Sequence, residues 1–188
     1  KRGVDHCNFL KVKYDNIEVV KSDLTDVYEE LLNKIPSKFK NILSLANTRA
    51  RIRMVTLYLI AGGTNGIVVG TGNKIEDFGI GFFTKYGDGG VDISPIADLM
   101  KSEVYELARN LKINQDIIDA LPTDGLWDDG RSDEDQLGVS YNQLEWAMNY
   151  KSGNLDKKHS DILQIYMKYR KQNLHKMKEI PVFKKTDS

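Results

Sequence analysis

A polar stretch over residues 70–92 holds side chains whose types suit nucleotide chemistry. Thr71 offers a hydroxyl group and Lys85 offers a cation. Glu76 and Asp77 offer hard carboxylate oxygens, and a carboxylate beside phosphate-binding groups is what a magnesium-nucleotide complex requires. The glycines of this stretch allow the backbone to approach a ligand closely or to turn sharply. By composition alone a glycine-rich surface loop fits equally well, since glycines without a defined spacing are a weak signal.

An alternation of helices and strands is expected to position this stretch. The longest predicted helix runs over about residues 41–61 and is stopped by Gly62-Gly63. Residues 66–70 form a continuous apolar run between glycines, which is typical of a strand buried on both faces of a parallel sheet. A further helix is predicted over 101–111. The sequence therefore predicts an α/β fold with a parallel sheet flanked by helices, in which ligands bind beyond the carboxyl ends of the strands.

The other predicted elements are mostly helices. They are a helix that ends at Tyr14, a strand over 17–20, and helices over about 25–33, 116–121, 141–150 and 157–174. Ser140 and Gln143 form a capping-box pair before the helix that begins at 141. The last helix carries an apolar stripe made of Ile162, Ile165, Tyr166 and Tyr169. Glu134 and Asp135 fit either a ligand-binding role or a helix start, and the helix start is the simpler interpretation.

The composition is that of an ordinary globular domain and excludes several classes of protein. The chain has 188 residues, and its 27 basic and 27 acidic side chains give a formal net charge of zero. This balance removes the general electrostatic case for a nucleic-acid or membrane-surface binder. The one cysteine, Cys7, favours a reducing, cytoplasmic location and excludes a thiolate metal cluster. No apolar run approaches the roughly 18 residues of a membrane span.

Seven blocks in collinear order cover nearly the whole chain. They are NTRARIRM (47–54), GTGNKIED (70–77), GFFTKYGDGGVD (81–92), SPIADLMK (94–101), LPTDGLW (121–127), DEDQLGVSY (133–141) and HK (175–176). In this combination the sequence resembles the ammonia-dependent NAD⁺ synthetases. The resemblance implies an ATP pyrophosphatase type of fold, related to the adenine nucleotide alpha hydrolases, and a homodimer with the dinucleotide at the subunit interface. It also implies a ligase that adenylates the nicotinate carboxylate of deamido-NAD⁺ with ATP and Mg²⁺, after which ammonia displaces AMP.

The resemblance assigns roles to individual positions. Thr71, Lys101 and Thr123 match ATP contacts. Glu76 matches the Mg²⁺ ligand when the family pattern is counted forward from Thr71. Counting backward from Lys85 selects Asp77 instead, because this sequence has one residue more than the family pattern between the acid and the GFFTK segment. Glu76 is preferred and Asp77 remains an alternative.

A second set of positions matches contacts with deamido-NAD⁺. These are Arg51, Lys85, Asp92, His175 and Lys176. An ammonium group suits an anionic diphosphate or carboxylate, and a carboxylate suits ribose hydroxyls. No side chain is an obvious nucleophile, so positioning and electrostatic stabilisation are expected to carry the catalysis.

The family also has a Ser-Gly-Gly-x-Asp-Ser loop that binds the pyrophosphate of ATP, and no such motif occurs between Lys1 and Ser188. We therefore expect residues 1–188 to be a single NAD⁺ synthetase domain without its N-terminal segment, and inactive or unstable alone. Two other classes stay open. One is a non-catalytic nucleotide-binding or interaction module, and the other is a different adenylating enzyme of the superfamily, which should lack the GFFTKYGDGG block.

Overall fold

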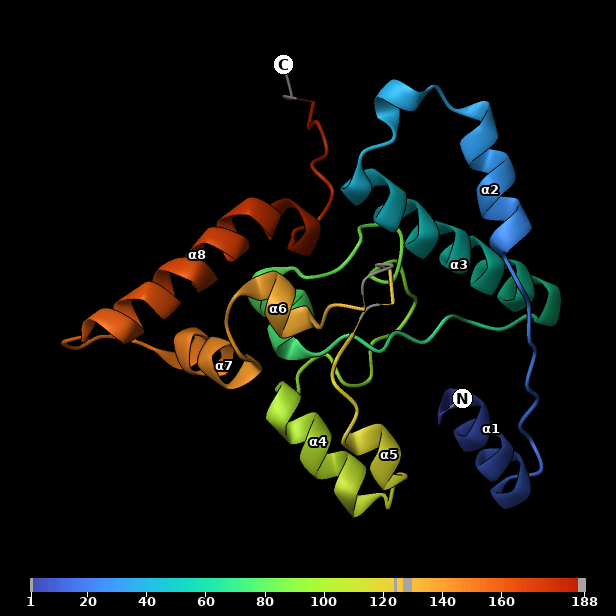
Figure 1. Cartoon of the computed structure of the whole chain (residues 1–188), viewed down its shortest axis with the longest axis horizontal. Coiled ribbons are helices and arrows are strands. Elements are labelled where there is room, and N and C mark those ends of the chain that lie inside the picture. Colours follow the sequence, from blue (N-terminus) through green and yellow to red (C-terminus); the bar gives the residue numbers. More distant parts are fainter. Residues whose placement is uncertain (1, 124, 127–129, 186–188) are drawn as a thin grey trace.

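The computed structural model describes residues 2–123, 125–126 and 130–185. Its helices are α1 (Arg2–Lys13), α2 (Thr25–Lys34), α3 (Ile42–Thr64), α4 (Lys101–Asn110), α5 (Gln115–Ile118), α6 (Asp133–Leu137), α7 (Tyr141–Asn149) and α8 (Lys157–Met177), with a 3-10 turn η1 (Ser37–Phe39) and a π-helix η2 (Lys74–Ile80). Long loops around η2 fill the middle of the molecule, with α7 and α8 on one side and α2 and α3 on the other (Figure 1). None of the helices in the described ranges is both long and apolar enough to pass through a membrane.

The main hydrophobic core lies where η2 packs against α7 and α8. Ile75 and Ile80 of η2 and Leu144 of α7 are completely buried, at 0% exposure. The predicted stripe on α8 is confirmed, because its members either belong to this core or pack against it. The predicted capping box is confirmed as well: Ser140 N–H donates to Gln143 Oε1 at 2.9 Å, and Gln143 N–H donates to Ser140 Oγ at 3.3 Å. Together the cap and the stripe fix α7 and α8 around η2.

Replacing Leu144 with alanine should lower the free energy of unfolding by about 2–5 kcal/mol, because it leaves a cavity in this core. Leu111→Ala is the matched control, since Leu111 is 60% exposed and its loss should cost less than about 0.5 kcal/mol. Urea denaturation of the full-length variants measures both values. Equal losses for the two variants would contradict the placement of the core.

The expected parallel sheet is not confirmed. Within the described ranges, strand pairing is limited to one parallel bridge between Val69 and Ile93. Gly70 N–H donates to the Ile93 carbonyl at 2.7 Å, and Asp92 N–H donates to the Val68 carbonyl at 3.0 Å. The strand predicted over 17–20 is wrong: these residues are irregular. A strand needs a neighbouring backbone for its N–H and C=O groups, and no described segment forms backbone hydrogen bonds with 17–20.

Three helices differ from the prediction by about one turn: α8 runs on to Met177, and α3 and α5 also end elsewhere than expected. α3 begins after Asn41, whose side chain accepts a hydrogen bond from Ser44 N–H at 2.8 Å, and it continues through Gly62-Gly63. It ends at Asn65, which takes a left-handed conformation with φ 54°. Asparagine tolerates this conformation better than most residues, so it supplies the C-terminal cap that the glycines were expected to supply. α5 covers four residues and ends before the predicted boundary at Pro122.

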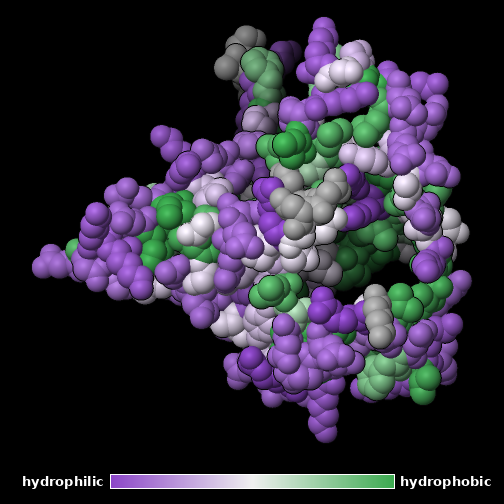
Figure 2. Space-filling view, in the orientation of Figure 1, coloured by the Kyte–Doolittle hydropathy of each residue, from purple (hydrophilic) through white to green (hydrophobic). Residues whose placement is uncertain are grey.

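α3 leaves large apolar side chains at the surface. Val55 is 69% exposed and Leu59 is 74% exposed. Outside α3, Ile67 is 60% exposed beside the bridged segment. The space-filling view shows hydrophobic residues at the surface among the polar ones (Figure 2). Exposed apolar residues gathered on one element are typical of a surface that other protein covers.

Candidate nucleotide-binding site

Side chains from four separate segments line one cavity of about 450 Å³, which we call the Thr71 cavity. Thr71 follows the bridged segment, Glu76 lies on η2, Lys101 opens α4, and Thr123 lies in the segment between α5 and α6. These are the three positions predicted to contact ATP and the position predicted to bind the metal. The structure thus brings together residues that lie up to 52 positions apart in the sequence (123 minus 71).

Glu76 faces the cavity because of the way η2 begins. The Asn73 side chain accepts hydrogen bonds from the N–H groups of Ile75 and Glu76, at 3.1 and 3.0 Å, and its amide group donates to the Glu76 carboxylate. At the other end, Gly81 N–H donates to the Glu76 carbonyl, five residues back, in a left-handed conformation with φ 66°. Ile75 therefore points into the core while Glu76 points into the Thr71 cavity.

Lys101 and Glu76 form an ion pair in the wall of the Thr71 cavity. The distance from Lys101 Nζ to Glu76 Oε1 is 2.7 Å, and the two side chains are only 19% and 15% exposed. A cation at the start of a helix is unfavourable towards the helix dipole. The carboxylate of Glu76 offsets this cost, so Lys101 has a partner even without a ligand.

Asp77, the alternative metal ligand, lies beside the Thr71 cavity but does not line it. Its carboxylate packs against Gly72, where a Cβ atom would lie 1.8 Å from Asp77 Oδ2. Burial raises the pKa of Asp77 to about 7, and the negative charges of Glu76 and Asp88 add to this effect. The carboxylates of Glu76, Asp77 and Asp88 therefore lie near one another around the start of η2.

Four of the five residues predicted to contact the dinucleotide meet around the loop at 81–86. Arg51 Nε donates to the Lys85 carbonyl at 3.2 Å, and Lys85 Nζ donates to the His175 carbonyl at 3.0 Å. Lys176 Nζ donates to the carbonyls of Gly81 and Phe83, at 2.8 and 2.7 Å, which ties α8 to this loop. Partial burial lowers the pKa of Lys176.

Asp92, the fifth residue, lies apart from this group and holds the bridged segment in place. Its two carboxylate oxygens accept hydrogen bonds from the Tyr58 hydroxyl at 3.0 Å and from Val68 N–H at 2.7 Å. The hydrogen bond from Tyr58 joins α3 to this segment. In this structure Asp92 therefore has a structural role.

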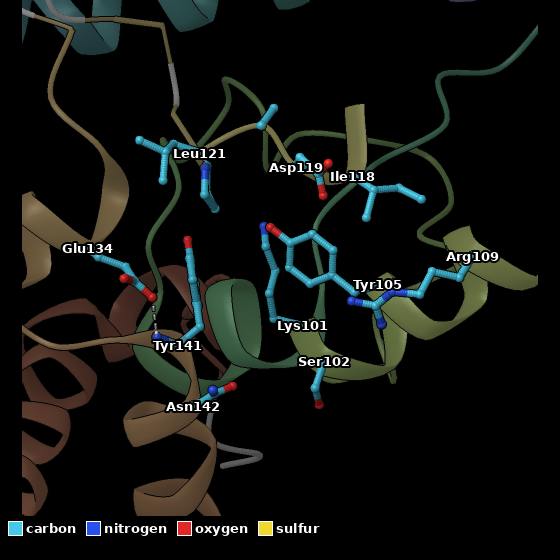
Figure 3. Close-up of a pocket in the computed structure, with 12 residues that line it drawn as sticks. Lys101, Ser102, Tyr105, Arg109, Ile118, Asp119, Leu121, Glu134, Tyr141 and Asn142 are labelled. Carbon is cyan, nitrogen blue, oxygen red and sulfur yellow. Dashed lines mark hydrogen bonds between the residues drawn. The ribbon is translucent and has the colours of Figure 1, made fainter. Parts of the chain in front are cut away.

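A second cavity of about 450 Å³, which we call the Tyr105 cavity, adjoins the first and shares Lys101 with it. Lys101 and Tyr141 extend side by side towards it from α4 and α7 (Figure 3). Glu134 also lines it and accepts a hydrogen bond from Tyr141 N–H at 2.9 Å. Asp135 accepts from Ser132 N–H at 2.9 Å in a capping box, which supports the helix-start interpretation of this acidic pair.

Sequence analysis did not single out Asn73 as part of the site. Its signal was present, because Asn73-Lys-Ile-Glu76 has the spacing of an N-terminal cap followed three residues later by an acid. Asp124 and Trp127, which belong to the LPTDGLW block, lie outside the described residues. Within the described part of the chain, no three His, Cys, Asp or Glu side chains are close enough together to hold a metal ion.

Cations, two threonine hydroxyls and carboxylates surround one cavity, which is the chemistry of a site for a charged, polar ligand. The sequence model of the NAD synthase family matches residues 5–187, and the chain belongs to this family. It is 40% identical over 153 residues to an NH₃-dependent NAD⁺ synthetase of Alkaliphilus oremlandii, covering 77% of this chain and 60% of that protein. The resemblance drawn from the seven blocks is confirmed.

Solved structures agree with this assignment. The NMN synthetase of Francisella tularensis superposes with a TM-score of 0.81 and 31% identity, over 97% of this chain and 73% of that one. The NH₃-dependent NAD synthetase of Campylobacter jejuni superposes with a TM-score of 0.65 over 86% of this chain and 64% of that one, and its 24% identity supports the fold alone. The chain spans between 51% and 66% of the length of the curated relatives it matches.

Proposed function

We propose that this chain is part of a ligase that uses ATP to amidate deamido-NAD⁺ to NAD⁺, with ammonia as the nitrogen donor. The observation that carries the proposal is the convergence of Thr71, Glu76, Lys101 and Thr123 on one cavity in a member of the NAD synthase family. The short parallel pairing at Val69 supports a parallel sheet in the whole protein. In this proposal residues 1–188 are a single NAD⁺ synthetase domain without its N-terminal segment.

The proposed reaction has two steps. A carboxylate oxygen of the nicotinate ring attacks the α-phosphorus of ATP, the bond to the β-phosphate oxygen breaks, and pyrophosphate leaves. Ammonia then attacks the carbonyl carbon of the adenylate, AMP leaves, and a proton is released. In this proposal Lys101 and the Thr71 and Thr123 hydroxyls hold the phosphates of ATP in line, so that positioning and charge stabilisation supply the rate enhancement.

The start of η2 fits a magnesium ion chemically. Hard carboxylate oxygens are present on Glu76, and the carboxylates of Asp77 and Asp88 lie near enough to add negative charge that a cation would offset. Mg²⁺ is usually held by one or two carboxylates together with substrate phosphates, and it neutralises charge on the phosphates during transfer. We propose Glu76 as the protein ligand because it lines the Thr71 cavity and Asp77 does not.

The group around the loop at 81–86 is the proposed binding surface for deamido-NAD⁺. Arg51, Lys85, His175 and Lys176 supply cations and hydrogen-bond donors for a diphosphate, and Asp92 stays a candidate for the ribose hydroxyls. The exposed apolar side chains of α3 support a homodimer. The single cysteine supports a cytoplasmic location.

The proposal is tested with the full-length protein, purified and supplied with ATP, Mg²⁺, deamido-NAD⁺ and ammonium. We expect NAD⁺, AMP and pyrophosphate in equal amounts. Without ammonium, labelled pyrophosphate should still exchange into ATP, because the first step is reversible and needs only ATP and deamido-NAD⁺ as substrates. Formation of ADP would contradict an adenylating ligase, and binding of ATP without any turnover would favour a non-catalytic nucleotide-binding module.

Lys85→Ala should raise the KM for deamido-NAD⁺ about tenfold or more, because it removes a charged donor worth more than 1.4 kcal/mol to an anionic ligand. The melting temperature should change little, since the lost contacts are an exposed hydrogen bond to the His175 carbonyl and a contact with the Tyr86 ring. Lys34→Ala is the matched control: Lys34 forms an exposed pair with Glu30 at 3.0 Å on α2, away from the loop. Unchanged steady-state kinetics for Lys85→Ala would argue against its role.

A mononucleotide substrate is a second candidate. The superposition with an NMN synthetase covers more of this chain, with a higher TM-score, than the superposition with the Campylobacter NAD synthetase. The same site chemistry would then amidate nicotinate mononucleotide. The two candidates are separated by kcat/KM for deamido-NAD⁺ and for nicotinate mononucleotide, measured with the same full-length enzyme. A preference for the mononucleotide would reassign the substrate while leaving the ATP chemistry in place.

A further inference from the structure

Tyr141 lines the Tyr105 cavity beside Lys101, which lines both cavities of the site. It is the first residue of α7, it is 5% exposed, and its ring lies under the ammonium group of Lys101, with 4.8 Å from Nζ to the ring centre. Its hydroxyl donates to Asp133 Oδ2 at 2.9 Å in a buried hydrogen bond. Its backbone N–H is held by Glu134, so ring, hydroxyl and backbone are all fixed by neighbouring elements.

The hydroxyl of Tyr141 lies in a negatively charged environment. The Asp133 carboxylate accepts the hydrogen bond of the phenol, so the hydroxyl acts there as a donor. Lys101 is placed between the Glu76 carboxylate and the face of this ring. An ammonium group over an aromatic face is attracted by the ring, and the attraction grows where water is excluded.

Lysine needs such support because its charge sits at the end of a flexible four-carbon chain. In the structure Glu76 supplies one contact. The phosphates of a bound nucleotide would compete with Glu76 for the same ammonium group, and a lysine held by Glu76 alone would then lose its fixed position. The ring of Tyr141 does not compete with phosphate oxygens for the N–H donors, since it meets the cation through its face.

We propose that Tyr141, oriented by Asp133, is a positioning residue that holds Lys101 in place for the phosphates of ATP. The proposal rests on the proposed function, in which Lys101 contacts ATP. Tyr141 acts through Lys101 and does not touch the reacting atoms. Asp133 fixes the direction of the phenol and lines the Thr71 cavity itself.

Another tyrosine near the same core shows what a purely structural role looks like. Tyr169 packs against the same hydrophobic cluster, and its hydroxyl donates to the backbone carbonyl of Gln136 at 3.1 Å. Among the described residues, its hydroxyl contacts this backbone carbonyl and not Lys101 or a carboxylate of the site. Tyr169→Phe therefore removes one tyrosine hydroxyl from this core without touching the site, and it is the matched control.

The test is a double-mutant cycle between Tyr141 and Lys101 in the full-length protein, read out as the Kd for ATP-Mg²⁺ by calorimetry and as the KM values for both substrates. Tyr141→Leu should weaken ATP binding roughly tenfold, since it removes both the ring and the hydroxyl. Tyr141→Phe should have a smaller effect, because it keeps the ring. The KM for deamido-NAD⁺ should stay within about twofold, and Tyr169→Phe should leave all constants unchanged.

In a Lys101→Met background the effect of Tyr141→Leu on ATP affinity should disappear, because the group that Tyr141 positions is gone. If Lys101→Met binds ATP too weakly for calorimetry, the KM for ATP closes the same cycle, and the effect of Tyr141→Leu should again disappear. Additive effects, or equal losses for both substrates, would overturn the positioning role. A wild-type protein that does not bind ATP would overturn the proposed function as well, so the two failures are distinguishable.

Discussion

Glu76→Gln should lower turnover about a hundredfold or more while the protein stays folded. Glutamine keeps the shape of the side chain but removes the charge that pairs with Lys101 at 2.7 Å and that is proposed to bind magnesium. Loss of a group that stabilises charge in the transition state typically has an effect of this size. The measurements are kcat and the Mg²⁺ concentration that gives half-maximal rate at fixed ATP, which should rise.

Asp77→Asn is the matched control for this prediction. It removes a neighbouring carboxylate of the same π-helix that packs against Gly72 and does not line the Thr71 cavity. Its effect on the Mg²⁺ requirement should be smaller than that of Glu76→Gln. The reverse order would move the metal ligand from Glu76 to Asp77.

Gly72→Ala should lower the free energy of unfolding by about 1–3 kcal/mol and remove most of the activity. The new Cβ would lie 1.8 Å from Asp77 Oδ2 and 2.3 Å from Asp77 Cγ, so the Asp77 carboxylate must move. Because Asp77 lies next to Glu76 on η2, this movement should also displace the proposed metal ligand. Urea denaturation and steady-state kinetics of the full-length variant measure the two effects.

Two further variants separate the clash from a general intolerance of alanine. Gly72→Ala combined with Asp77→Ala removes the clashing carboxylate and should recover most of the lost stability. Gly62→Ala should raise stability by roughly 0.5–1 kcal/mol, because Gly62 lies within α3 and a Cβ there meets no other atom within 4 Å. If the double variant is as unstable as Gly72→Ala, the contact with Asp77 is not the cause.

The helices with strong local signals were predictable from the sequence. The cap at Ser140 and Gln143 and the stripe on α8 act within a few residues, so the sequence contains the whole signal. The strand at 17–20 failed because β structure depends on a partner backbone that local sequence does not reveal. The π-helix η2 was missed because its five-residue hydrogen bond has no characteristic apolar period.

The residues of the site were predictable from motif order, but their contacts were not. Thr71, Glu76, Lys101 and Thr123 were chosen one block at a time, and only the structure shows that they share a cavity. The contact between Tyr141 and Lys101 joins two different blocks, and no spacing rule within either block could have indicated it. Asp92 was also chosen from a block, but in this structure its carboxylate accepts hydrogen bonds from Tyr58 and Val68 and so holds the backbone in place.

The seven residues of η2 have a consequence for protein engineering. Ile75 and Ile80 are among the most deeply buried side chains of the main core, and Glu76 between them faces the Thr71 cavity. A library that randomises this segment to change substrate preference would therefore also select for solubility and expression at the same positions. Variants with altered specificity should be sought instead at the Tyr105 cavity, where Leu121 is 75% exposed and tolerance to substitution should be greater.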